Sequence, residues 1–313
     1  MLKHLNNGVI MDINFFKQTR ILDGGMGQEL LAKGMRSNGT LWSANAMLQE
    51  KYHKLLLDTH LDFIKSGSEV IVTNTFTARK VRLRDNGIED KFEYLNNKAG
   101  EIALQAKKLF PNVLVAGGLP PQYLTYEADT RSDKEIIENF NSQAKLLNPY
   151  ADFFYLDVLS SVKEFKIAID CIRKFNKPYL LGAHISEGTT LPSGEKITDI
   201  IKKINHDKLL GIILSCISPE NYELNLDEIK KLGIPFGFKL NAFIRTNPKP
   251  NYTGAYKKSK TGNPNEFLGQ RKDLTPEKMA RFAKKFKNAG ATILGGCCET
   301  RPSHIKEMAK LIS

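Results

Sequence analysis

The sequence lacks the signals of several protein classes. Its 313 residues contain no apolar run close to the ~18 residues that cross a membrane, and residues 1–7 show no secretory apolar segment. No stretch rich in proline, serine or glycine divides the chain, so we expect one large domain. The expected protein is cytoplasmic and has no membrane-bound part.

Acidic residues are also in short supply, with 34 Asp and Glu against 46 Lys and Arg, for a formal net charge of +12. Such an excess can indicate a nucleic-acid partner. The lysines, however, are spread over amphipathic stretches such as residues 202–203, 230–231 and 284–285, without a zinc-finger spacing or a basic motif interleaved with aromatics. We therefore expect a solvated, lysine-rich surface and no nucleic acid.

Cysteine is scarce, yet three of the four cysteines follow apolar runs. Cys297 and Cys298 come after a β-branched run and two glycines, and Cys216 ends the apolar run 209–216. Cys171 falls in a helical pattern and is expected to be a buried packing thiol. Adjacent cysteines can be small buried hydrophobes, a strained vicinal disulfide, or two ligands of one soft metal, and the last reading needs a third ligand from elsewhere.

Eight apolar runs, each followed by a helical pattern, predict an α/β fold made of one (β/α)₈ TIM barrel with parallel strands. An open doubly wound sheet is the competing architecture, and the lack of a linker favours closure. Residues 1–16 are expected to form an N-terminal extension and residues 17–313 the barrel. Ser43 is the predicted N-cap of a helix that runs to about Ser66. The eight runs are residues 18–27, 69–76, 113–118, 151–159, 177–185, 209–216, 235–243 and 290–298.

In such a barrel the carboxyl ends of the strands meet at one mouth, where the active site is expected. Strands six and eight end ~10 Å apart, a gap that Cys216 and the Cys297–Cys298 pair can bridge with zinc ~2.3 Å from each sulfur. Three thiolates leave one tetrahedral position open, which favours chemistry on a substrate thiol. The strand-end residues are Asp23, Asn74, Thr75, Gly117, Gly118, Asp157, His184, Cys216, Asn241, Cys297 and Cys298.

The sequence resembles the zinc-dependent homocysteine S-methyltransferases from about residue 20 to residue 312. The matching segments are residues 22–27 (LDGGMG), 41–44 (LWSA), 72–76 (VTNTF), 115–118 (VAGG), 215–216 (SC) and 295–298 (GGCC). The resemblance implies one Zn²⁺ per chain held by Cys216, Cys297 and Cys298, with the thiolate of homocysteine as the fourth ligand. A methyl group would pass to that sulfur and give methionine.

Homocysteine carries an ammonium and a carboxylate, and both need partners in the pocket. Asp23 and Asp157 are the candidate ammonium acceptors, although Asp23 can be a turn aspartate and Asp157 a helix cap. The amides of Gly24 and Gly25 and the Thr75 hydroxyl are the candidate carboxylate donors. His184 is expected to be a hydrogen-bonded core histidine.

The sequence departs from the family pattern at Asp157, where glutamate is usual, and at Ser215, where asparagine is usual. Both departures concern the amino-acid pocket. They leave open a second reading, in which the chain is a zinc- and thiol-binding barrel with a different acceptor or no transferase activity.

The methyl donor is expected to be a small onium compound, because 313 residues leave no room for folate and cobalamin modules. Betaine, S-methylmethionine, S-adenosylmethionine and dimethylsulfoniopropionate all qualify. An onium group favours an aromatic face, so Trp42 and Tyr123 are donor-site candidates, beside Tyr126, Tyr252 and Tyr256. Trp42 can also simply cover the mouth. Residues 245–271 are the predicted lid.

Overall fold

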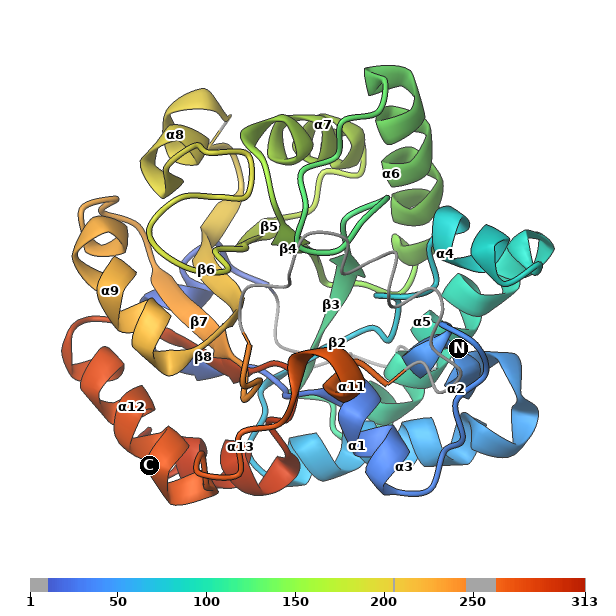
Figure 1. Cartoon of the computed structure of the whole chain (residues 1–313), viewed down its shortest axis with the longest axis horizontal. Coiled ribbons are helices and arrows are strands. Elements are labelled where there is room, and N and C mark those ends of the chain that lie inside the picture. Colours follow the sequence, from blue (N-terminus) through green and yellow to red (C-terminus); the bar gives the residue numbers. More distant parts are fainter. Residues whose placement is uncertain (1–10, 205, 246–262, 313) are drawn as a thin grey trace, which may run out of the picture.

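A computed structural model of the chain describes residues 11–204, 206–245 and 263–312. Within these ranges eight parallel strands form one sheet in the order β1-β8-β7-β6-β5-β4-β3-β2, with helices around it (Figure 1). A parallel bridge from Leu22 to Val70 joins the two edge strands, and the Asp23 amide donates to the Val70 carbonyl across 3.0 Å. The sheet therefore curls into the predicted (β/α)₈ barrel.

The elements alternate as the apolar pattern predicts. The strands are β1 Arg20–Ile21, β2 Val70–Val72, β3 Leu114–Leu119, β4 Phe153–Leu159, β5 Tyr179–Ala183, β6 Leu209–Ile217, β7 Phe236–Leu240 and β8 Ile293–Gly296. The helices are α1 Met26–Ala32, α2 Asn45–Leu48, α3 His53–Lys65, α4 Lys80–Asp85, α5 Phe92–Leu109, α6 Asp133–Leu147, α7 Val162–Arg173, α8 Ile197–Lys203, α9 Pro219–Lys230, α11 Asn265–Leu268, α12 Pro276–Asn288 and α13 Pro302–Ala309. No helix in the described ranges is long and apolar enough to cross a bilayer.

Local sequence explains where the outer helices begin. Ser132, Ser161, Ser218 and Thr275 are the N-caps of α6, α7, α9 and α12, and each side-chain oxygen accepts a backbone N–H from the first turn. Proline occupies the first turn of α9, α12 and α13, where its missing N–H has no cost. The helices bury one face against strands that are covered on both sides, as a parallel sheet requires.

The predicted helix from Ser43 to Ser66 is wrong as a single element. The segment forms a 3₁₀ turn at Trp42–Ala44, the short helix α2, a second 3₁₀ turn at Glu50–Tyr52 and then α3. Gln49 separates α2 from the second 3₁₀ turn because its backbone is extended, with φ −108° and ψ 116°. Ser43 lies inside the first turn and caps nothing. Periodicity alone did not show this break.

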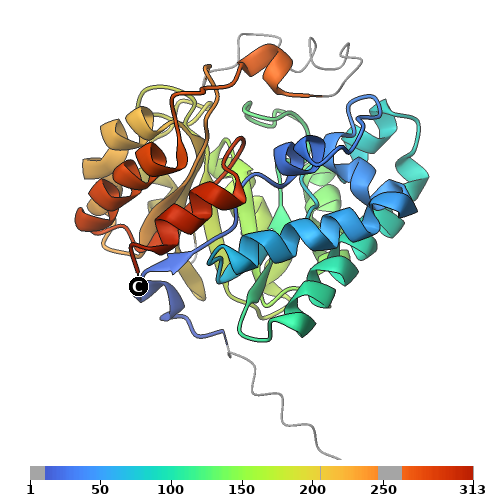
Figure 2. The ribbon, with the colours of Figure 1, turned by 90° about the horizontal axis from the view of Figure 1, so that it is seen from below.

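The two ends of the barrel differ in their contents. Phe16, in the 3₁₀ turn Phe15–Lys17, is fully buried and packs with Leu22, Val70 and Phe153 inside the barrel. Figure 2 shows this turn at the end of the barrel opposite α11. The amino-terminal end is therefore filled with apolar side chains, whereas the carboxyl ends of the strands lie on the side of α11. The boundary predicted at residue 17 stays a prediction.

Glu164 gives the fold a testable pH dependence. Burial raises the pKa of this carboxyl from 4.5 to about 7, although Ser161 donates a hydrogen bond to it across 2.7 Å. Between about pH 5 and 7 the unfolded chain has lost this proton and the folded chain has kept it. The free energy of unfolding therefore falls as pH rises through this window, by up to about 3 kcal/mol from this group. Glu164→Gln should flatten that slope in urea unfolding.

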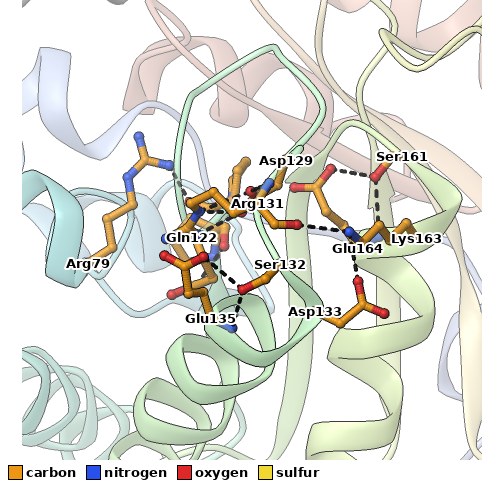
Figure 3. A network of polar contacts seen from close by, with 12 residues as sticks. Arg79, Gln122, Asp129, Arg131, Ser132, Asp133, Glu135, Ser161, Lys163 and Glu164 are labelled. Carbon is orange, nitrogen blue, oxygen red and sulfur yellow. Dashed lines mark hydrogen bonds and ion pairs between the residues drawn. The ribbon is translucent and has the colours of Figure 1, made fainter.

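A matched control lies one helix earlier, as Figure 3 shows. Ser132 and Glu135 form the same N-terminal pairing on α6, with 2.8 Å between the hydroxyl and the carboxylate, but at an exposed position. Glu135→Gln should leave the wild-type slope between pH 5 and 7 in place. Equal slopes in the two variants would show that burial of Glu164 is not the cause.

Candidate active site

The three strand-end thiols predicted to meet do lie together. The Sγ atoms of Cys216, Cys297 and Cys298 are all within 4.8 Å of one another, and those of Cys216 and Cys298 are 4.0 Å apart. Cys216 and Cys298 are buried, and Cys297 is partly exposed. Backbone hydrogen bonds fix the pair after β8, since Cys297 donates to Leu240 across 2.7 Å and Cys298 accepts from Ala242 across 3.0 Å.

Irregular backbone turns two of the strand ends toward the mouth. The β6–β7 register shifts between Ser215 and Ile217, and Cys216 at this bulge has φ 56°. The β4–β5 register shifts between Leu156 and Leu159, where Val158 has φ 63°. Left-handed backbone is unfavourable for such residues and is concentrated at functional sites, where a bulge re-aims a side chain. Both bulges flank residues that face the same cavity.

The thiol cluster fits a zinc ion. Tetrahedral zinc with ~2.3 Å bonds to sulfur places its ligands ~3.8 Å apart, close to the spacing found here. Thiolates select zinc over magnesium or calcium. In the part of the chain that the structure describes, no fourth His, Cys, Asp or Glu joins the group. The residues present would therefore hold zinc through three sulfurs and leave one position for a ligand.

Polar neighbours favour a thiolate at Cys216. The Tyr126 hydroxyl lies 3.0 Å from its Sγ, and the Asn241 amide donates to its carbonyl across 2.6 Å and approaches its Sγ to 3.6 Å. Burial opposes ionisation, but hydrogen bonds from the other two thiols and Tyr126 outweigh it and hold the pKa of Cys216 well below its usual range. Hydrogen bonding to Cys216 raises the pKa of Cys297 and Cys298. One of three thiols is thus prepared to be an anion.

A cavity of about 880 Å³, its solvent-open mouth included, lies over the thiols. Trp42, Phe76 and Tyr126 supply its aromatic lining, and the Trp42 and Phe76 rings meet edge to face at 6.4 Å. The Trp42 indole donates to Gln28 across 3.0 Å, and Gln28 in turn donates to Glu299 across 2.8 Å. Trp42 is therefore tied to the residue that directly follows the Cys297–Cys298 pair.

Only some of the other predicted site residues line the cavity. Asp23, Gly24, Gly25 and Asp157 line the cavity, but the Gly25 amide already donates to the Thr300 carbonyl across 2.8 Å. The cavity lining does not include Thr75 or Tyr123. The Thr75 hydroxyl donates to the Gly118 carbonyl across 2.7 Å, and the Tyr123 ring lies 4.8 Å beneath the guanidinium of Arg131. Tyr252, Tyr256 and most of the lid predicted at 245–271 lie outside the described residues.

His184 lies beside the site as a core histidine. It is fully buried, its Nδ1 is 3.2 Å from the Ser215 carbonyl, and its Nε2 is 2.6 Å from the Ser186 hydroxyl. Its ring packs against Tyr126 with 4.4 Å between centroids and 32° between the ring planes. His184 therefore supports the tyrosine that contacts Cys216, as the prediction of a hydrogen-bonded core histidine implies.

Sequence reasoning missed a charged pair inside the barrel. Lys239, on β7, is 6% exposed and its Nζ donates to Asp23 Oδ1 across 2.7 Å. Asp157 on β4 lines the same cavity, and burial raises the pKa of its carboxyl to about 6 in spite of the lysine. A lysine inside the apolar strand 236–240 was the available signal, because a charge there must be paired.

The loop that carries Tyr126 is held by buried charge. Arg79 has no exposed surface and donates to the Pro121 carbonyl and, across 2.6 Å, to the Thr125 hydroxyl. Figure 3 shows this arginine facing the loop between β3 and α6, whose far end is fixed by the ion pair of Arg131 and Asp129 at 2.7 Å. The position of Tyr126 over the thiols thus depends on an ion pair and hydrogen bonds made by other residues of its loop.

Fold and site together define a (β/α)₈ barrel with a three-thiol centre and an aromatic-lined cavity at the carboxyl ends of its strands. A family model described as homocysteine S-methyltransferase matches residues 20–312, so the chain belongs to this family of methyltransferases.

Individual relatives agree over nearly their whole length. The chain is 24% identical to homocysteine S-methyltransferase of Escherichia coli strain K12, covering 91% of this chain and 92% of that protein. It is also 24% identical to homocysteine S-methyltransferase YbgG of Bacillus subtilis strain 168, covering 92% and 93%. The metallated E. coli homocysteine methyltransferase MmuM superposes with a TM-score of 0.75 at 19% identity, over 94% of this chain and 96% of that one. That likeness shows the fold.

Proposed function

We propose that this protein transfers a methyl group from a small onium donor to the thiolate of homocysteine, giving methionine, in a zinc-dependent reaction. The observation that carries the proposal is the convergence of three thiols at the floor of a cavity with aromatic walls. Family membership supports homocysteine as the acceptor. Zinc bound by these thiols would lower the pKa of the acceptor thiol, so that its proton leaves to solvent.

The residues of the chain then have separate tasks. Cys216, Cys297 and Cys298 would hold zinc, and the bulge at Cys216 sets the direction of the first thiol. The aromatic rings of Trp42, Phe76 and Tyr126 offer negative faces to a positively charged donor and exclude water around it. Residues near the thiols thus orient the two reactants for displacement along one line.

The reaction balances without a further co-reactant. A bond forms between the acceptor sulfur and the methyl carbon, and the bond from that carbon to the donor's positive sulfur or nitrogen breaks. The donor leaves as a neutral thioether or amine centre with the bonding electrons. Betaine, S-methylmethionine, S-adenosylmethionine and dimethylsulfoniopropionate all satisfy this balance, and all carry a carboxylate. Arg82, which lines the same cavity, is the proposed partner of that carboxylate.

The test is methionine formation from homocysteine with each of the four donors, with and without a zinc chelator. We expect product with at least one donor, and loss of product after chelation that is reversed by added zinc. Zinc-loaded protein that forms no methionine with any donor would refute the proposal. That result would favour the second reading, a zinc- and thiol-binding barrel with a different acceptor or none.

A further inference from the structure

Lys239 is a buried cation in the acceptor pocket for which the proposed reaction has so far no use. Its side chain lines the cavity together with Asp23, Asp157 and Cys297, and it lies over the Tyr155 ring at 5.8 Å. Burial opposes its charge, but Asp23 and Asp157 outweigh this and raise the pKa of Lys239 above its usual value. The pocket therefore contains a buried ammonium group that is paired with Asp23.

This ammonium changes the task of Asp23. Oδ1 of Asp23 accepts from Lys239 across 2.7 Å, and Oδ2 accepts from the Val72 amide across 2.8 Å. Both oxygens thus have donors, and a full positive charge compensates the carboxylate. Asp157, which lines the same cavity and is partly open to it, is left as the anion that faces a ligand ammonium.

Two of the three donors expected for the ligand carboxylate are also in use. The Gly25 amide is bonded to Thr300, and the Thr75 hydroxyl is bonded to Gly118. An ammonium has three N–H donors, and among the described residues Asp23 is the single side chain hydrogen-bonded to Lys239 Nζ. Two donors of Lys239 are therefore available to an anionic ligand group.

We propose that Lys239 binds the carboxylate of the thiol acceptor and that Asp23 orients Lys239, which leaves Asp157, of the two acidic residues expected from the sequence, as the partner of the acceptor ammonium. The proposal rests on the function proposed above and assigns the two charged ends of the acceptor to separate residues. It makes Lys239 a specificity-determining residue, and it predicts selection for thiols that carry a carboxylate.

Three acceptors separate these contacts. Homocysteine has both charged groups, 4-mercaptobutyrate lacks the ammonium, and 3-mercaptopropylamine lacks the carboxylate. Lys239→Met should raise KM about 10- to 100-fold for homocysteine and 4-mercaptobutyrate, because this is the effect of losing a charge-assisted hydrogen bond. KM for 3-mercaptopropylamine should rise less than about threefold, because this acceptor has no carboxylate. Asp157→Asn should show the opposite pattern. It should raise KM for homocysteine and 3-mercaptopropylamine, which carry the ammonium, and leave KM for 4-mercaptobutyrate nearly unchanged.

Binding can be measured without turnover. Trp42 is the single tryptophan of the chain and lines the cavity, so its fluorescence should report acceptor binding to the zinc-loaded protein. If Lys239→Met does not fold, the double variant Asp23→Asn with Lys239→Met removes both charges of the pair and serves instead. Circular dichroism and zinc content establish that each variant is intact.

The outcomes are distinct. The role of Lys239 would be overturned if Lys239→Met raised KM equally for all three acceptors. It would also be overturned if KM did not rise for the two acceptors that carry a carboxylate. Wild-type protein that methylates none of the acceptors would refute the proposed function, while the fluorescence titrations would still show whether Lys239 selects carboxylates.

Discussion

Cys298→Ala should leave the barrel folded but reduce its zinc content from about one ion per chain to less than a tenth of that. Two thiolates and a water hold zinc far more weakly than three thiolates, and changes even beyond the ligands cost about 10- to 100-fold in affinity or activity. Methionine formation should therefore fall by more than about 100-fold. Metal analysis after dialysis against a weak chelator, with the activity assay, measures both effects.

Cys171→Ala is the matched control, because it removes a thiol far from the cluster. Cys171 lies on α7 and approaches the Ile137 carbonyl with a sulfur-to-oxygen distance of 3.7 Å, and burial raises the pKa of its thiol to about 11. We expect full zinc content and activity in this variant. A Cys298→Ala protein that keeps stoichiometric zinc and wild-type activity would show that the thiols do not form the metal centre.

Most of the fold was predictable because parallel strands leave a strong pattern. Six of the eight predicted apolar runs contain the observed strand, and β3 and β6 each extend one residue beyond theirs. The thiols near the end of β6 and after β8 meet as barrel closure requires. The helix predicted from Ser43 to Ser66 failed since the extended backbone at Gln49 has no clear signal in composition. Tertiary packing decides such interruptions, and a periodic pattern averages over them.

The site was harder to predict, for a different reason. The thiols and Asp23 have recognisable neighbours in sequence. Lys239 does not, because its hydrogen-bond partner, Asp23, is 216 residues away in the chain. The Thr75 hydroxyl and Gly25 amide follow the right strands, yet their hydrogen bonds are satisfied by Gly118 and Thr300. Position at a strand end shows that a residue is near the mouth. It does not show whether its polar group is free for a ligand.

The surroundings of Trp42 hold its ring in place at the expected donor site. Its backbone has φ 45°, and a methyl group placed on Gly27 would meet the indole at 2.3 Å, so the glycine lets the ring approach α1 closely. The ring is thereby held at the cavity with Phe76 and Tyr126. A conformation this unfavourable for a bulky residue is consistent with a role in binding.

Trp42→Leu should raise KM for the active onium donor about 10- to 30-fold and change KM for homocysteine little. A cation over a desolvated indole gains about 2 kcal/mol, and leucine keeps the apolar surface but offers no π face. Trp42→Phe, which keeps a ring but loses the hydrogen bond to Gln28, should show a smaller rise in KM for the donor.

The sharpest measurement compares the donor with its neutral carbon isostere, such as 3,3-dimethylbutyrate for betaine, as competing ligands. Wild-type protein should prefer the onium compound, and Trp42→Leu should lose that preference. If both proteins discriminate equally, charge recognition lies elsewhere in the cavity and Trp42 acts only as a cover over the thiols.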